Sequence, residues 1–428
     1  MPAAPRFTTE QDPADWCATI AILFLALLWW RLGIPSQIYF DEVHYVTAAR
    51  HYNEGTRFNP EHPLLAKSIL AAAIRWLGDE PLYWRVPSAL AGAIGLFALG
   101  RLVWFVTGKR LVTLAAMFLV ASNFLWFVIS RIAMLDMIMV LFGMIALWLA
   151  ASAVRLPHQG RWRLALAGVA MGLALGAKWS IAPLLLVPGL VFLVCKLRDH
   201  GWRGLYRRTG GAVPGITLAE AGLWLGLVPL AVYWLTYWQG FFWAKNPIDP
   251  FDPLGWHAYM LQLQDSVTRP HPYRSVWYEW IGNWRAIWFL YQDVDGAYRG
   301  ILLIGNPFTM LAGLAALGWC LWAGFRHGRS DALVFAGFYA LSLLFWALSG
   351  KPVQFYYHYL LPAAFLMVCL ALALDALWRR RDRWRWLAPA TLLASLAVFI
   401  HFYPILSAGP LCCGRPSFEY WMWLRSWR

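Results

Sequence analysis

The 428-residue sequence is poor in charge, since only 14% of its residues are Asp, Glu, Lys or Arg. Soluble domains carry about 25% charged residues, so this composition argues against an ordinary soluble enzyme. Hydrophobic residues make up 60% of the chain, and no long polar stretch is present that would form a separate soluble domain. The sequence therefore predicts a polytopic membrane protein.

The sequence also lacks a Cys-x-x-Cys motif, although it contains six cysteines. This absence excludes a zinc ribbon and a thioredoxin-like redox site. Two of the cysteines are adjacent, at Cys412 and Cys413 in the C-terminal tail. The net charge of +14 comes without a basic patch interleaved with aromatic residues, so we expect no nucleic-acid partner.

Long apolar segments, by contrast, are abundant. A helix needs about 20 mostly apolar residues to cross a membrane, and by this criterion we place about eleven spans. The predicted fold is therefore an all-α bundle in the lipid bilayer, without an internal repeat. The predicted spans are 16–34, 86–106, 111–128, 132–152, 163–178, 180–196, 217–238, 300–324, 331–349, 355–377 and 385–404.

The loops between these spans alternate in charge. If the N-terminus is cytoplasmic, every second loop is basic, from Lys109–Arg110 to Arg379–Arg385, and the short loops between them have almost no Lys or Arg. Cytoplasmic loops are enriched in these residues. We therefore expect the loops 35–85 and 239–299 on the outer side of the membrane.

The whole chain, residues 1–428, is predicted to form one transmembrane domain with a C-terminal outer tail at 405–428. The first outer loop is expected to contain two short amphipathic helices, near 42–52 and 63–77.

Two adjacent carboxylates, Asp41 and Glu42, follow the first predicted span. A carboxylate at the membrane surface can accept a proton from a hydroxyl group within hydrogen-bonding distance. The alternative is structural, because Asp41 could cap the N-terminus of a helix that starts at Glu42. Both interpretations stay open on these residues alone.

A second polar cluster, Glu61 and His62, lies about twenty residues further along the chain. Both side-chain types bind divalent metals, and His257 or His271 in the second outer loop could complete such a site. The alternative is that His62 hydrogen-bonds to the loop backbone. A divalent metal is therefore one interpretation, and no other cofactor is expected. The pattern Asp293-x-Asp295 is too short to predict a metal site.

Several cations lie at the outer ends of the predicted spans, at the same depth in the membrane. A charge in this position often marks a binding site, and Arg and Lys both bind phosphate. The alternatives are snorkelling to the headgroups, favoured for Lys67, and an ion pair of Arg131 with Asp136. The candidates for phosphate binding are Arg85, Arg131, Lys178 and Lys351.

The aromatic run Phe355–Tyr359, which includes Tyr357 and His358, opens the tenth predicted span. It is typical of the aromatic belt at a membrane interface. A wall for a sugar ring or an isoprenoid chain is the functional alternative.

Taken together and in this order, the polar blocks resemble those of the protein O-mannosyltransferase family, over nearly the whole chain. The sequence departs from the family pattern at Pro63-Leu64, where a second proline is usual, and at Ala66-Lys67, where a glycine is usual. It lacks the large soluble insert of eukaryotic members and so resembles bacterial ones. The similar blocks are Phe40–Tyr45, Glu61–Lys67, Trp84–Ala89, Ser130–Asp136, Gly172–Trp179, His271–Ser275, Gly305–Pro307 and Phe355–Pro362.

The resemblance implies a GT-C glycosyltransferase that takes a sugar, typically mannose, from a polyprenyl phosphate and inverts its anomeric centre. It implies that Asp41 is the base, that Glu42 is an acceptor-side partner and that Arg85 is needed for activity. Glu61, His62, Tyr357 and His358 are then candidates for binding the sugar or the acceptor.

We expect Ser or Thr hydroxyls of exported proteins to be the acceptors, at a periplasmic active site of the bacterial inner membrane. An envelope glycolipid such as lipid A is the alternative acceptor, and a lipid-sugar flippase is less favoured because no repeat is seen. A monomer and a dimer are both compatible with the sequence.

Overall fold

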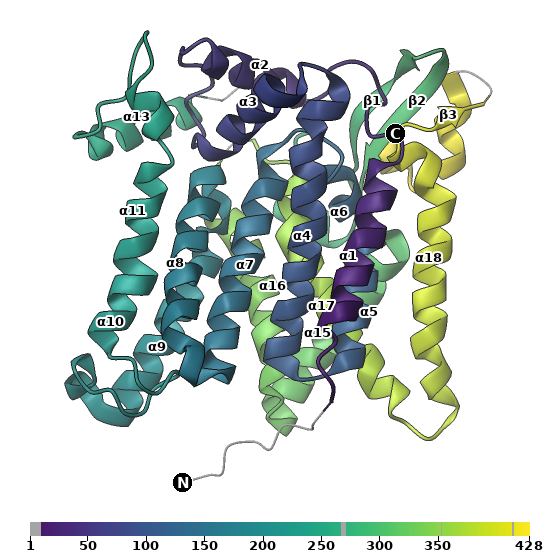
Figure 1. The fold of residues 1–428 in the computed structure, drawn as a ribbon. Coiled ribbons are helices and arrows are strands. Elements are labelled where there is room, and N and C mark those ends of the chain that lie inside the picture. The colour runs from purple at the N-terminus through teal and green to yellow at the C-terminus, as the bar shows by residue number, and fades with distance from the viewer. Residues whose placement is uncertain (1–9, 267–270, 352, 413–414) are drawn as a thin grey trace.

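The computed structural model of the chain describes residues 10–266, 271–351, 353–412 and 415–428. Apolar helices run side by side through the body of the molecule, and the start of α1 and the C-terminus lie at opposite ends of the bundle (Figure 1). Among the described residues, eight helices are long and apolar enough to cross a membrane. The chain is therefore an integral membrane protein.

The observed helices agree with the predicted spans. The three predicted spans outside the group of eight correspond to the shorter helices α1 (Ala14–Trp29), α5 (Arg110–Ala121) and α8 (Gly160–Ala177). The eight candidates contain α4 (Pro81–Thr107), α7 (Leu135–Arg155), α9 (Ala182–His200), α10 (Leu218–Gly222) continuing into α11 (Val228–Leu235), α15 (Pro307–His327), α16 (Ser330–Leu348), α17 (Leu360–Trp378) and α18 (Leu387–Leu406).

An outer layer of short elements covers one end of the bundle (Figure 1). It contains the two helices predicted in the first outer loop, now α2 (Glu42–Asn53) and α3 (Leu65–Leu77). The long outer loop adds α12 (Trp238–Phe241), α13 (Pro253–Asp265) and α14 (Trp277–Ile281). This layer holds Asp41, Glu61 and the loops around them.

A small antiparallel sheet completes the outer layer and was not predicted from the sequence. Its strands are β1 (Ile287–Val294), β2 (Ala297–Leu303) and β3 (Pro410–Leu411), in the order β1-β2-β3. The predicted span 300–324 began too early, because the apolar residues Ile301–Leu303 end a strand. The helix itself begins at Pro307, where Asn306 caps it by accepting a hydrogen bond from the Thr309 amide.

The third predicted span is a broken helix. After α5, Ser122 and Asn123 interrupt the helical hydrogen bonds, and α6 (Phe124–Ile129) starts again with the Asn123 side chain accepting from the Leu125 amide at 3.0 Å. The break is stabilised by neighbours, since Ser122 Oγ lies 2.8 Å from Ser395 Oγ on α18. This second helix carries the chain to the outer loop that contains Arg131.

A row of glycines on α8 allows α11 to approach closely. A Cβ atom on Gly172 would lie 2.6 Å from the Pro229 carbonyl oxygen and 2.6 Å from the Cβ of Val232. A Cβ atom on Gly168 would likewise meet the segment between α10 and α11, and a Cβ atom on Gly176 would meet the C-terminal end of α11. Small residues at four-residue spacing are a common means of packing membrane helices. The contact fixes the end of α8, which is followed directly by Lys178.

We predict that Gly172→Leu lowers the thermal unfolding temperature of the purified protein in detergent. Overpacking a close helix contact costs about 1–3 kcal/mol or more. The matched control is Gly318→Leu on α15, where an added Cβ meets nothing within 4 Å among the described residues. Equal unfolding temperatures for the two variants would contradict the close α8–α11 contact.

Candidate active site

The segment that joins α1 to α2 is held from below by Arg85 of α4. The guanidinium of Arg85 is completely buried and forms a two-pronged ion pair with Glu42, Nε to Oε1 at 2.8 Å and NH2 to Oε2 at 2.9 Å. Its other N–H groups donate to the carbonyl oxygens of Leu32 (3.2 Å), Pro35 (2.8 Å) and Gln37 (2.9 Å). All five N–H groups of Arg85 are thus used within the protein.

This geometry corrects two expectations. Arg85 has no donor left for a phosphate, so it organises the outer loop instead of binding the substrate. Glu42 is equally occupied, because it also accepts hydrogen bonds from the amides of Tyr39 (3.3 Å) and Ala133 (3.1 Å) and is fully buried. A carboxylate so enclosed cannot contact an acceptor.

Arg131 has a similar structural role at the end of α1. It donates to the carbonyl oxygens of Leu28, Trp30 (2.9 Å) and Arg31 (3.0 Å), at the end of a helix where the last carbonyl groups lack helical partners. The expectation that Arg131 binds phosphate is therefore not supported. The alternative, an ion pair with Asp136, is wrong, because Asp136 pairs with Lys178 at 2.7 and 2.9 Å.

Asp41 differs from its neighbour Glu42 in burial and in hydrogen bonding. It is half-buried, and in the described chain its carboxylate makes no capping hydrogen bond to α2, so the capping alternative is wrong. Phe40 before it adopts a left-handed backbone with φ of 49°. The Phe40 ring stacks on Phe289 with a centroid distance of 4.0 Å and meets Tyr357 edge-on at 6.3 Å.

The surroundings of Asp41 favour a proton acceptor that works near neutral pH. Burial raises the pKa of the Asp41 carboxyl to about 6, while His44 and Lys178 hold it down, Asp136 raises it, and the Tyr357 hydroxyl lowers it. A carboxylate with a pKa close to the working pH is well suited to general-base catalysis.

Two lysines interact electrostatically with this carboxylate. Lys178, just before α9, is buried between its partner Asp136 and the Tyr357 ring, whose centroid is 5.2 Å from Nζ. Lys351, just after α16, is half-buried and has no ion pair with any described residue. Burial and the charge of Lys178 lower the pKa of Lys351 to about 8, and Asp136, Asp41 and Glu61 oppose this shift. The structure thus groups Asp41, Asp136, Lys178, Lys351 and Tyr357.

The Glu61–His62 turn forms a further wall of this polar site. Lys67 of α3 is completely buried and donates to the carbonyl oxygens of His62 (2.8 Å) and Asn59, so it holds this turn and does not snorkel. Burial lowers the pKa of Lys67 to about 7. Burial, and then the charges of Lys178 and Lys351, lower the pKa of the His62 ring well below its usual value. His62 is therefore neutral and near the two lysines.

The remaining candidates divide between packing and surface positions. His358 stacks on Trp346 at 3.7 Å and its Nδ1 accepts from the Phe355 amide at 3.1 Å, which indicates a packing role. His271 is exposed and receives the Tyr273 amide at 3.2 Å. Cys412 is exposed, and its neighbour Cys413 lies outside the described residues.

The candidate metal ligands do not come together. Within the described ranges, no group of three His, Cys, Asp or Glu side chains is arranged to hold a metal ion. His257 is instead bonded to Tyr233 at 2.6 Å, and the Glu61 carboxylate receives the Asn59 side-chain amide at 2.5 Å. Sequence reasoning also missed Phe289, because the strand that carries it was not predicted.

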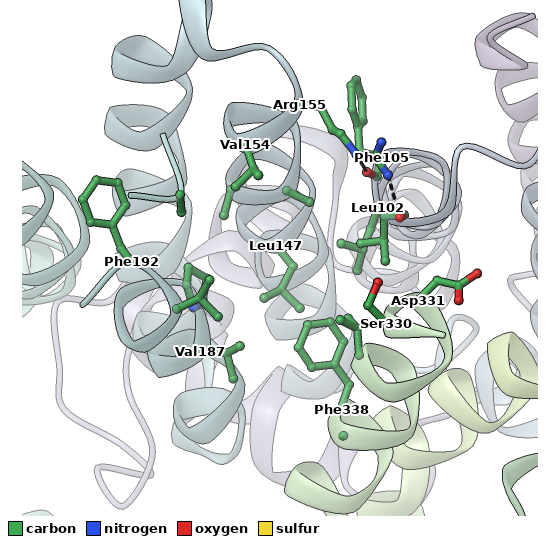
Figure 2. A pocket seen from close by; sticks show the side chains of 18 of the residues that line it. Leu102, Phe105, Leu147, Val154, Arg155, Val187, Phe192, Ser330, Asp331 and Phe338 are labelled. Carbon is green, nitrogen blue, oxygen red and sulfur yellow. Dashed lines mark hydrogen bonds between the residues drawn. The ribbon is translucent and has the colours of Figure 1, made fainter. Parts of the chain in front are cut away.

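An apolar cavity of about 620 Å³ lies in the opposite half of the bundle, away from Asp41. Figure 2 shows Leu147, Val187 and Phe338 around it, from α7, α9 and α16. The cavity residues of α4 and α7 are near the ends of these helices remote from Arg85 and Asp136. The cavity is therefore part of the helical bundle and not of the polar site.

Comparison with protein families gives consistent matches along the chain. Two profiles described as dolichyl-phosphate-mannose-protein mannosyltransferase match residues 18–88 and 61–219. A third, described as the C-terminal four-span region of protein-O-mannosyltransferase, matches residues 253–427. Both outer loops and the polar site fall within these matches.

Similar proteins are found in several bacteria. A polyprenol-phosphate-mannose–protein mannosyltransferase of Mycolicibacterium smegmatis strain MKD8 is 28% identical, over 99% of this chain and 95% of the relative. The protein of the same name from Corynebacterium glutamicum is 27% identical, over 100% of this chain and 96% of the relative.

Solved structures share the fold at low sequence identity. A chain of the Saccharomyces cerevisiae Pmt1-Pmt2 complex bound to the sugar donor superposes with a TM-score of 0.79 at 15% identity, covering 98% of this chain and 93% of its own. ArnT from Cupriavidus metallidurans bound to undecaprenyl phosphate gives 0.59 at 15% identity, with coverage of 96% and 68%. The fold is that of the GT-C glycosyltransferases.

We predict that Arg85→Met destabilises the protein by about 3–5 kcal/mol, because it leaves the Glu42 carboxylate buried without its partner. The measurement is thermal unfolding of the purified variant in detergent. The control is Arg50→Met, which removes an ion pair to Asp79 whose side chains are 39% and 42% exposed. Exposed pairs contribute about 0–1 kcal/mol, so similar losses in both variants would refute the assigned role of Arg85.

Proposed function

The chain belongs to the dolichyl-phosphate-mannose–protein mannosyltransferase family, and on this basis we propose that it transfers mannose from a polyprenyl phosphate to Ser or Thr hydroxyls of exported proteins. The observation that carries this proposal is the polar group at the outer end of the bundle. It offers Asp41, a carboxylate without an ion pair among the described residues, beside two lysines, Lys178 and Lys351. A base and a phosphate-binding pair are the chemical requirements of this transfer.

In this proposal the donor phosphate binds between Lys178 and Lys351. Lys178 lies in the turn between α8 and α9, and Lys351 lies three residues after the end of α16, so both stand at the outer ends of two neighbouring helices. The same two helices line the apolar cavity in the opposite half of the bundle (Figure 2). A lipid with its phosphate at the lysines can therefore place its isoprenoid chain along α9 and α16.

The reaction needs one base and no general acid. The acceptor oxygen attacks the anomeric carbon, the bond from that carbon to the phosphate oxygen breaks, and its electron pair leaves with the phosphate. The lysine charges stabilise that leaving group, and Asp41 takes the hydroxyl proton. A double-displacement route needs a second carboxylate at the anomeric carbon. Glu42 is enclosed in its ion pair with Arg85, which supports direct displacement with inversion.

We further propose that the site faces the periplasm, across the inner membrane of a bacterium. The alternation of basic loops supports this orientation. Asp41, Lys178 and Lys351 border helix ends on the side of the outer layer, where α2, α3 and the β-sheet lie (Figure 1). An exported polypeptide and a lipid-linked sugar both have access to this side.

We predict that Asp41→Asn lowers mannose transfer by about 10²–10⁴-fold, the usual contribution of a general base. The assay uses purified enzyme, labelled polyprenyl-phosphate-mannose and a Ser/Thr-rich peptide, with a lipid extract as a second acceptor. The unfolding temperature should not change, because Asp41 does not cap α2. Full activity of this variant would end the assignment of the base, and labelling of lipid alone would assign a glycolipid acceptor.

The dependence of the transfer reaction on pH should show one acidic and one alkaline limit. Activity is expected to fall as the pH drops through about 6, because Asp41 becomes protonated and can no longer accept the proton. The KM for the donor is expected to rise as the pH increases through about 8, because Lys351 loses its charge. Arg stays protonated throughout this range, so Lys351→Arg should remove the alkaline limit. An unchanged alkaline limit in that variant argues against phosphate binding by Lys351.

A further inference from the structure

The β1–β2 hairpin contacts the segment before Asp41 at two points. At its tip, the Asp295 carboxylate accepts a hydrogen bond from the Ser36 amide at 2.9 Å and another from the Ser36 hydroxyl. Within β1, the Phe289 ring stacks on Phe40, with a centroid distance of 4.0 Å and an angle of 20° between the ring planes. The hairpin therefore holds both ends of residues 36–40.

The hairpin is itself firmly anchored. Arg299 of β2 is buried and donates to the carbonyl oxygens of Val294 (3.0 Å), Asp295 (3.0 Å) and Ala408 (2.9 Å). The third of these bonds ties the turn to the C-terminal tail. Trp288 adds a second link to that tail by donating to the Trp427 carbonyl oxygen at 3.0 Å. Because the hairpin is anchored in this way, its contacts fix the position of residues 36–40.

The held segment is strained at the residue next to the base. Phe40 has a φ of 49°, which costs a bulky residue about 1–3 kcal/mol and persists only where the surroundings impose it. Arg85 fixes the start of the segment through Pro35 and Gln37. Phe289 fixes its end, by stacking on Phe40, and Phe40 also meets the edge of Tyr357. The direction of the next side chain, Asp41, depends on these contacts.

We propose that the β1–β2 hairpin is a clamp that orients Asp41 toward the acceptor hydroxyl, with Phe289 and Asp295 as its positioning residues. The inference rests on the proposed function, because it takes Asp41 to be the base. It also gives a role to Asp295, which the sequence presented only as part of a short Asp-x-Asp pattern. Neither positioning residue contacts the reacting atoms.

The clamp also controls the surroundings of the carboxylate. The groups that act on Asp41 are His44 from α2, Lys178, Asp136 from α7 and Tyr357. The rings of Phe289, Phe40 and Tyr357 form a continuous row beside it. Removing the Phe289 ring allows water to approach Asp41, and hydration favours the charged form, so the pKa of Asp41 falls. A structural defect alone would lower the amount of active enzyme without lowering the pKa of Asp41.

The test compares full-length variants in the peptide transfer assay across pH. Phe289→Ala is expected to lower kcat on the order of 100-fold through misplacement of the base. It should leave the donor KM unchanged and move the acid limit to a pH below the wild-type value. Asp295→Ala should also lower kcat, and Asp295→Asn should restore it, because an amide can still accept from the Ser36 amide and tolerates a left-handed backbone.

The matched control is Asp293→Ala, an exposed residue two positions away in the same hairpin. Its kcat and pH dependence should equal those of the wild type. An unchanged kcat and acid limit in Phe289→Ala, or equal effects of the Asp293 and Asp295 variants, would overturn the clamp. If Phe289→Ala does not fold, as judged by thermal unfolding, the kcat values of the two Asp295 variants decide whether the clamp exists. Absence of transfer by the wild type itself would overturn the proposed function, and the clamp with it, whereas an active wild type with unchanged variants would overturn the clamp alone.

Discussion

The outer half of this structure depends on one buried ion pair, Arg85–Glu42. A charge without a partner in such a place is too costly to keep, so each residue requires the other. Arg85 belongs to α4 and Glu42 begins α2, and their remaining hydrogen bonds reach residues 32–39 and Ala133 before α7. The pair therefore joins three parts of the chain at the membrane surface, and Asp41 lies directly beside it.

The two adjacent carboxylates have different roles because of what surrounds them. Glu42 is neutralised by an arginine with all its donors engaged, so it contributes to structure. Burial raises the pKa of Asp41 to about 6, and His44, Lys178, Asp136 and the Tyr357 hydroxyl act on it to a smaller extent. The cations divide in the same way. Arg85 and Arg131 bind backbone carbonyl groups, whereas Lys178 and Lys351 remain beside the base. The two arginines thus serve the structure, and the two lysines are the charges left for the proposed chemistry.

The architecture also suits substrates of opposite character. A lipid-linked donor needs an apolar path within the bilayer, and α9 and α16 offer one, with a cavity at one end and a lysine at the other. A polypeptide acceptor needs a polar surface outside the bilayer. The outer layer supplies that surface, and the β-hairpin within it contacts the loop that carries the proposed base. In the proposed reaction, donor and acceptor meet at the boundary between these two environments.

The sequence alone determined the membrane class and the spans, because hydropathy is a property of short segments, and it predicted the orientation and a role for Asp41. It also placed α2 and α3 correctly. The partners of the charged residues were decided only by the tertiary structure. Arg85 with Glu42, and Lys178 with Asp136, are pairs 43 and 42 residues apart, and no local pattern specifies such contacts. The hairpin at 287–303 was missed for a related reason. Its apolar strand residues have the composition of a membrane helix, and only pairing across the turn and with β3 makes them a sheet.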